Sequence, residues 1–113
     1  MPAANYDLYI EQGATYSQEF VWKDSTGTPI NLSTYTARMQ VRQVKTENII
    51  LNLTNTSGIT LGSNGSIKIA VSATGTSALP TLNARYDLEL QSSNGTVTRL
   101  LQGEVVISAE VTR

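Results

Sequence analysis

The sequence predicts an all-β protein, namely an antiparallel β-sandwich of about seven to nine short strands with one helical turn. Apolar and polar residues alternate with a period of two through most of the chain, which is typical of strands with one buried face. Clusters of Gly, Asn, Asp and Ser interrupt the alternation at the short spacing of an all-β domain. Only one segment, residues 73–79, has helical character.

The strands are predicted from rows of apolar residues. In the row of Tyr86, Leu88 and Leu90, the neighbours in sequence are charged or amide residues. In chain order the predicted strands cover residues 6–11, 14–23, 35–42, 49–53, 59–61, 66–72, 85–91, 96–98 and 104–112. Residues 93–95 predict a two-residue hairpin turn, and Gly103 predicts a bend or bulge where the chain passes between sheets.

Residues 73–79 are expected to form one or two helical turns. Ser72 or Thr74 supplies the N-terminal cap, and Pro80 ends the helix because the residue before a proline avoids helical geometry. A helical turn in this place, just before a tyrosine-led strand, is typical of immunoglobulin-like sandwiches. Tyr86 is then either a corner tyrosine that bonds back to the turn near Leu79 or a simple core tyrosine, and both interpretations stay open.

Composition excludes several functions. The chain has no cysteine and no histidine, so it has no disulfide framework and lacks the commonest general base and metal ligand. A net charge of −1 provides no basic field for a nucleic-acid partner. No signal peptide and no apolar run of roughly 20 residues is present, so we expect no membrane partner and synthesis in the cytoplasm. We expect one domain, residues 1–113, with residues 1–5 as a flexible arm.

No catalytic, cofactor or metal site is predicted. Asp87 and Glu89 share one strand face, but such carboxylate pairs are usually solvated, and no aromatic groove accompanies them. The segment 24–27 does not have the spacing of a calcium loop, so Asp24 is expected to cap its own turn. Without histidine, no serine-based triad can be built.

Two groups of side chains remain as candidate binding surfaces. Arg38, Arg42, Arg85 and Arg99 lie on polar strand faces. They are expected either to pair across strands with Asp87 or Glu89, or to form a polar patch that docks another protein. Trp22 and Tyr16 are expected either in the core or in a sugar-binding platform, and their shared strand face favours the core.

Several longer motifs carry a resemblance to a known family. In order they are Tyr6-Asp7-Leu8, Glu11-Gln12-Gly13-Ala14-Thr15, Phe20-Val21-Trp22-Lys23-Asp24, Gly27-Thr28-Pro29-Ile30-Asn31-Leu32, Ala78-Leu79-Pro80, Tyr86-Asp87-Leu88-Glu89-Leu90, Leu100-Leu101-Gln102-Gly103 and Glu110-Val111-Thr112-Arg113. Over essentially the whole chain they resemble small virion structural proteins of tailed bacteriophages and prophages. The first half is also similar to the N-terminal domain of phage baseplate upper proteins.

The resemblance implies a non-enzymatic virion component, namely a tail or baseplate docking module that bridges other tail proteins. Its partners would be virion proteins, in multiple symmetric copies, with no cofactor and with the virion as its location. The alternatives are a capsid-decoration or neck protein, and a carbohydrate-binding module that uses Trp22.

Docking is expected at an edge strand, because an edge offers unpaired backbone groups to a neighbour. The first strand, residues 6–11, and the last are the candidate edges. On the last strand the candidate docking residues are Glu104, Val106, Ser108, Glu110 and Thr112.

Overall fold

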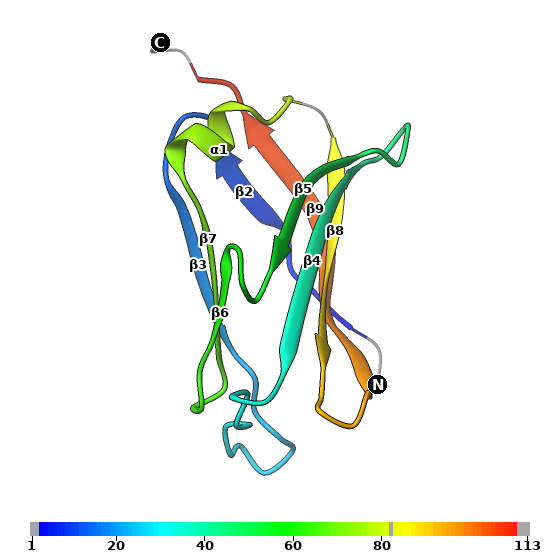
Figure 1. Ribbon diagram of the computed structural model, residues 1–113. Coiled ribbons are helices and arrows are strands. Elements are labelled where there is room, and N and C mark those ends of the chain that lie inside the picture. The colour runs from blue at the N-terminus through cyan, green and yellow to red at the C-terminus, as the bar shows by residue number, and fades with distance from the viewer. Residues whose placement is uncertain (1–2, 82, 111–113) are drawn as a thin grey trace.

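Two β-sheets pack face to face in the computed structural model, which describes residues 3–81 and 83–110 (Figure 1). The elements are β1 (Ala4–Asn5), β2 (Leu8–Glu11), β3 (Tyr16–Val21), β4 (Thr36–Gln43), β5 (Ile49–Thr54), β6 (Ile59–Leu61), β7 (Ser66–Val71), α1 (Ala73–Ser77), β8 (Ala84–Gln91) and β9 (Val97–Ser108). The predicted all-β sandwich with one helical turn is confirmed, and nearly every predicted strand coincides with an observed one.

The larger sheet has the strand order β1-β9-β8-β4-β5, with β2 also paired to β9, and the smaller sheet has the order β3-β7-β6. Most pairings are antiparallel, as predicted. The exceptions are β1 and β2, which run parallel to β9, with Leu8 opposite Val105. Alternation along a strand does not encode which strand lies beside it, so this parallel pairing was not predicted.

The core lies between the sheets and consists of the inward rows of the strands. The fully buried apolar side chains are Leu8, Ile10, Leu32, Met39, Val41, Ile67, Ile69, Leu88, Leu90 and Val105. The inward row of β3 is only half-buried, and it includes Gln18 beside Tyr16 and Phe20. A polar residue in that row had predicted this incomplete burial.

Helix α1 closes one end of the sandwich beside the turn that joins β2 to β3 (Figure 1). Its N-terminal cap is Ser72, whose hydroxyl accepts a hydrogen bond from the N–H of Gly75 at 3.1 Å. Thr76 is completely buried. Its hydroxyl donates to the carbonyl of Ala14 at 2.8 Å and accepts from the N–H of Gly13 at 3.0 Å. One buried hydroxyl therefore joins the helix to a turn about 60 residues earlier in the chain.

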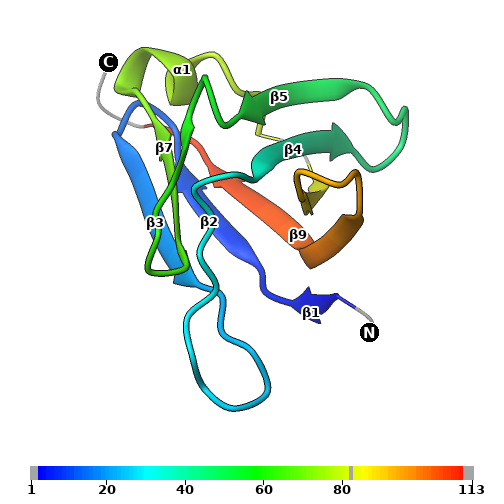
Figure 2. The same ribbon diagram turned by 60° about the horizontal axis from the view of Figure 1, so that its bottom comes forward.

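The N-terminal segment is paired to β9 from Ala4 onward, and Figure 2 shows β1 and β2 following one another along that strand. The predicted flexible arm, residues 1–5, is therefore wrong for Ala4 and Asn5, while residues 1 and 2 lie outside the described ranges. Between β1 and β2, the Asp7 carboxylate accepts a hydrogen bond from the N–H of Glu104 at 3.0 Å. This contact replaces a ladder bond where the edge strand is interrupted.

Gly103 is the point where this N-terminal segment comes closest to β9. A Cβ atom added to Gly103 would lie 2.4 Å from the carbonyl oxygen of Tyr6. The predicted bend at Gly103 is wrong, because β9 runs without interruption from Val97 to Ser108. The irregularity in the β8–β9 pairing lies instead at Leu100, which has no partner in the register. Gly103 is thus required for close backbone approach rather than for a change of direction.

Tyr86 lies directly across from Gly103 and is buried. Its hydroxyl donates a hydrogen bond to the carbonyl of Tyr6, the same oxygen that approaches Gly103. Of the two interpretations left open for Tyr86, the corner that bonds back to the turn near Leu79 is therefore wrong, and Tyr86 is a core tyrosine. Its ring reaches across β9 at the one position where no side chain intervenes.

The Tyr86 hydroxyl makes folding stability sensitive to alkaline pH. Burial raises the pKa of Tyr86 above its ordinary value, with smaller contributions from Tyr16, Asp7 and Tyr6. In the unfolded chain, the Tyr86 hydroxyl ionises at about pH 10. Because the folded pKa is the higher one, this stabilisation is complete below about pH 10 and is lost as the pH rises toward the folded pKa.

Replacement of Tyr86 by phenylalanine tests this hydrogen bond. We expect Tyr86→Phe to lower the free energy of unfolding by about 1 kcal/mol at neutral pH, because the carbonyl of Tyr6 loses its donor. The difference from the wild-type protein should shrink above about pH 10, since only the wild type loses the contribution of this hydroxyl. Urea unfolding at a series of pH values measures both quantities, and a difference that stays constant with pH would contradict the assignment.

The hairpin between β8 and β9 has a loop of three residues, one more than predicted. The N–H of Ser92 donates to the carbonyl of Thr96 at 2.9 Å, and Gly95 has a φ of 90°, in the left-handed region. A three-residue loop with glycine in this conformation is the next commonest hairpin connection after the two-residue turns. The Asn94 side chain accepts from the N–H of Thr96 at 3.2 Å and fixes the loop.

Candidate functional site, a charged groove on the larger sheet

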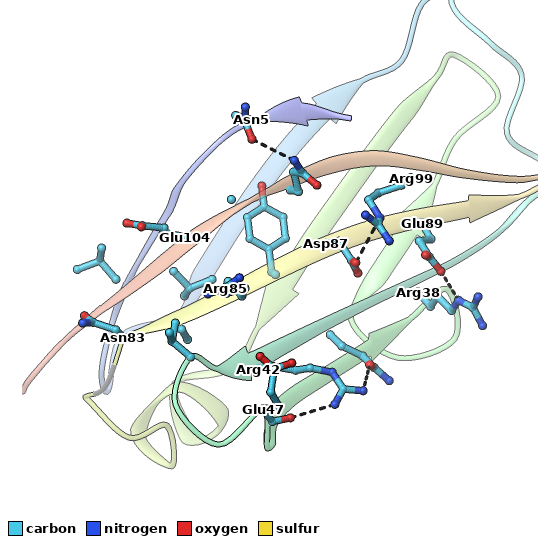
Figure 3. Close-up of a pocket in the computed structure, with 18 residues that line it drawn as sticks. Asn5, Arg38, Arg42, Glu47, Asn83, Arg85, Asp87, Glu89, Arg99 and Glu104 are labelled. Carbon is cyan, nitrogen blue, oxygen red and sulfur yellow. Dashed lines mark hydrogen bonds and ion pairs between the residues drawn. The ribbon is translucent and has the colours of Figure 1, made fainter. Parts of the chain in front are cut away.

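The outer faces of β4, β8 and β9 form an open groove with a volume of about 970 Å³ (Figure 3). We call this surface the charged groove. The strand register arranges its side chains in three rows that cross the sheet. The rows are Arg38-Glu89-Arg99, Gln40-Asp87-Gln102 and Arg42-Arg85-Glu104. The alternation of each strand directs these side chains away from the core, and the register alone brings them together.

Two ion pairs cross the strands of the charged groove. Arg38 Nε lies 2.7 Å from Glu89 Oε1, and Arg99 Nε lies 3.5 Å from Asp87 Oδ2, as the dashed lines in Figure 3 mark. Both arginine side chains are more than half exposed. Ion pairs of this kind contribute only about 0.2–1 kcal/mol to stability. Their main effect is to hold both carboxylates in defined positions, which confirms the predicted pairing of these arginines across strands.

The row that contains Arg42 and Arg85 is different, because two cations lie directly opposite one another. Arg42 donates to the carbonyl of Glu47 and to the side chain of Gln40, both at 2.9 Å. The exposed side chain of Arg85 makes no hydrogen bond or ion pair with any residue in the two described ranges. Like charges opposite one another destabilise a sheet. This end of the groove therefore presents positive charge that the fold does not use.

The candidate docking residues of the last strand have a different setting from the predicted one. Strand β9 is not an edge, because β8 pairs with one side of it and β1 and β2 pair with the other. From Leu101 onward, β9 consequently has a neighbouring strand on both sides. Strand β2, within the predicted first strand, is an edge, since it pairs with β9 alone among the described elements.

Three of these residues, Glu104, Val106 and Ser108, have exposed side chains on β9, and Glu104 and Val106 line the charged groove. Glu110 lies beyond β9, where its N–H donates to the side chain of Gln12 at 3.0 Å. Thr112 lies outside the described residues. The docking role of this set stays a prediction, and Glu104, Val106 and Ser108 lie on a strand inside the sheet instead of at its edge.

The other sequence candidates have structural roles. The Asp24 carboxylate accepts hydrogen bonds from the N–H groups of Thr26 and Thr28 at 2.9 and 3.0 Å, which confirms that it caps its own turn. The Thr26 hydroxyl also donates to this carboxylate. Its hydrogen bond makes the largest contribution, together with the backbone bonds, to lowering the pKa of Asp24. Trp22 packs against the core and meets Tyr35 edge to face, with ring centroids 5.9 Å apart. It therefore belongs to the core rather than to a sugar-binding platform.

The part of the chain that the structure describes contains neither a cluster of metal-binding side chains nor a helix that could span a membrane. Across residues 3–81 and 83–110, no group of three or more acidic, histidine or cysteine side chains is arranged to hold a metal ion. The only helix found there, α1, has five residues, so none is long enough to cross a membrane.

Comparison with known proteins identifies the fold. No family model and no curated protein sequence matches the chain. Among solved structures, it is similar to the extracellular domain of the voltage-gated sodium channel beta4 subunit, with a TM-score of 0.50, 13% identity, and coverage of 98% of this chain and 97% of that one. Murine CRIg matches with a TM-score of 0.46, 8% identity and 92% coverage of each chain. The likeness to the beta4 domain confirms the predicted immunoglobulin-like sandwich.

The predicted function, a structural component of a tailed-phage virion, is contradicted by this comparison. The beta4 domain, which this chain resembles in fold, is described as having a role in cell–cell adhesion and not as a phage protein. The motifs behind the resemblance are strand rows and turn residues, and such patterns report a fold that many functions share. The family resemblance and the virion location stay predictions.

Proposed function

We propose that this chain is a non-enzymatic protein-binding domain and that the charged groove is its docking surface. The observation that carries the proposal is the row of Arg42, Arg85 and Glu104, in which the fold leaves the charge of Arg85 unused. Charges arranged in this way favour association with a surface of complementary charge and set the orientation of the partner.

The mixture of charges in the groove favours a protein over other partners. The lining contains both four arginines, Arg38, Arg42, Arg85 and Arg99, and four carboxylates, Glu47, Asp87, Glu89 and Glu104. A phosphate backbone requires a continuous positive surface, and these carboxylates would repel it. A small molecule is usually enclosed in a largely apolar cavity, whereas this groove is open and polar. The partner that fits has carboxylates placed to meet Arg42 and Arg85.

The pKa shifts of Tyr16, Asp24 and Tyr86 have structural causes. Asp24 is held in its turn by hydrogen bonds, and Tyr16 and Tyr86 have raised pKa values chiefly because burial disfavours their ionised forms. A tyrosine with a raised pKa is ionised to a smaller extent at neutral pH than an exposed tyrosine. The beta4 domain is described as a homodimer with a role in cell–cell adhesion, and a protein-binding role for this chain belongs to the same class.

Site-specific photo-crosslinking tests the proposal. A photoreactive residue is placed in the groove at Gln40 or at Glu104, and a control is placed at Thr60 on the outer face of the smaller sheet. In extract of the organism that carries the gene, we expect one discrete crosslinked protein from both groove positions and none from Thr60. Crosslinks from Thr60 alone, or from no position, would overturn the proposed function.

Reversal of charge at the unused end of the groove should abolish that crosslink. The double variant Arg42→Glu and Arg85→Glu turns the attraction for a carboxylate-bearing partner into repulsion. Arg85 is exposed and without a side-chain partner in the described chain, whereas Arg42 gives up its hydrogen bonds to Glu47 and Gln40, so we expect the free energy of unfolding to fall by about 1–2 kcal/mol. Lys68→Glu, on β7 of the other sheet, is the matched control and should leave the crosslink unchanged. Retention of the crosslink in the double variant would show that the positive end of the groove does not bind the partner.

A further inference from the structure

We infer that β5 is a self-association edge, which pairs antiparallel with the β5 strand of a second copy of this chain. The inference rests on the edge of the larger sheet and not on the charged groove. Strand β5 is at the end of the strand order β1-β9-β8-β4-β5 and pairs only with β4 in the described part of the molecule (Figure 1). Every second backbone N–H and C=O of β5 consequently points away from the sheet.

The composition of β5 sets it apart from the other edges. Proteins prevent unwanted pairing at edge strands by means of charges, proline, β-bulges or very short length. In this fold β1 and β6 have two and three residues, β2 contains Glu11 and β3 contains Glu19. Strand β5 has six residues, Ile-Ile-Leu-Asn-Leu-Thr, with no charged residue, glycine or proline, and its one bulge, at Ile50, lies outside the regular pairing of residues 51–54 with β4. The exposed side chain of Ile49 adds apolar surface at one end of it.

A second copy of β5 fits this edge in one register. Leu51 and Leu53 face the core, since they lie opposite the buried Val41 and Met39, while Asn52 faces outward opposite Gln40. Directly opposite residues in an antiparallel pair share a face. A two-fold axis at Asn52 therefore places Leu51 opposite Leu53 of the second copy on the core face. The two Asn52 side chains then meet on the outer face.

Pairing of the two copies about this axis brings no like charges together. Each β5 lacks charge, so no like charges oppose one another within the pair. The charged residues of the β4–β5 turn, Lys45 and Glu47, would extend toward residues 55–59 of the second copy, which are uncharged. An isologous contact of this kind closes after two chains, because the same patch is used on both copies. The larger sheets of the two copies would form one continuous sheet.

Substitution at the symmetry axis tests the inference with the full chain. Analytical ultracentrifugation from about 1 μM to 1 mM should show the wild type changing from the 12.2 kDa monomer to a particle of twice that mass. Asn52→Lys places two cations opposite one another and should stay monomeric at concentrations where the wild type is dimeric. Asn52 is exposed, so the variant should keep its circular dichroism spectrum. Ser17→Lys, on the β3 edge of the other sheet, is the matched control and should dimerise normally.

A mixing experiment makes the outcome specific. Asn52→Asp should also be monomeric by itself, whereas an equal mixture of the Asn52→Lys and Asn52→Asp chains should form dimers through opposite charges. A wild type that remains monomeric over the whole range, or an Asn52→Lys chain that dimerises as well as the wild type, would overturn the inference. The crosslinking result from Glu104 is independent of either outcome, because β8 and β4 separate β9 from β5.

Discussion

Replacement of Thr76 by valine is expected to lower the free energy of unfolding by about 1–3 kcal/mol, because two partly buried backbone groups lose their hydrogen-bond partner. The side chain is completely buried, and its hydroxyl satisfies the carbonyl of Ala14 and the N–H of Gly13. Valine has nearly the same shape, so it fills the site without supplying either bond. Urea or thermal unfolding gives the difference directly.

Thr76→Ser is the matched control for that experiment. Serine keeps the hydroxyl and lacks one methyl group. The loss of this buried apolar surface should lower the free energy of unfolding by about 1 kcal/mol. We therefore expect the serine variant to be the more stable of the two. If valine were tolerated as well as serine, packing rather than the hydroxyl would join α1 to the turn at Gly13 and Ala14.

Gly103→Ala is expected to destabilise the protein by about 1–3 kcal/mol, the usual cost of an overpacked site. The added Cβ would lie 2.4 Å from the carbonyl oxygen of Tyr6, and backbone cannot swing aside as a flexible side chain can. Relief requires the segment between β1 and β2 to move off β9, which breaks the hydrogen bonds that Tyr86 and Asp7 make there. Hydrogen exchange should then become faster in Ala4–Glu11 than in the rest of the larger sheet.

Gly27→Ala separates this clash from the general cost of replacing a glycine. A Cβ at Gly27 meets no atom within 4 Å, but the residue has a φ of 86°. Its replacement should cost about 1 kcal/mol from backbone strain and leave exchange in the N-terminal strands unchanged. Equal exchange in the two variants would show that Gly103 does not hold these strands in place.

The period of two predicted the strands well because it is local. A row such as Leu88 and Leu90 identifies its own buried face without reference to any other strand. The neighbours of a strand are determined by contacts distant in sequence, and here the prediction failed. The last strand was taken for an edge, whereas β9 lies between β8 and the two N-terminal strands.

The residues of the charged groove could be predicted from the sequence, but their arrangement could not. The alternation assigned the four arginines to polar faces, and the pairing with Asp87 or Glu89 was one of the two expected outcomes. Which arginine meets which carboxylate depends on the register and on the unpaired Leu100, and neither has a signature in the sequence. The role of Thr76 was not predicted for a related reason. In the sequence, a threonine that will be buried looks the same as an exposed one, and only the fold brings Gly13 and Ala14 next to it.

The parallel pairing of the N-terminal strands with β9 determines the order in which the fold can assemble. Asp7 and Glu104 are 97 residues apart in sequence, whereas the β8–β9 hairpin closes over a three-residue loop. Closing a long loop costs more chain entropy than closing a short one, and folding slows as such distant contacts accumulate. Strands β1 and β2 are synthesised first but pair last. Until β9 has been synthesised, Leu8 and Ile10 in the growing chain lack the strand that they pair with in the folded protein.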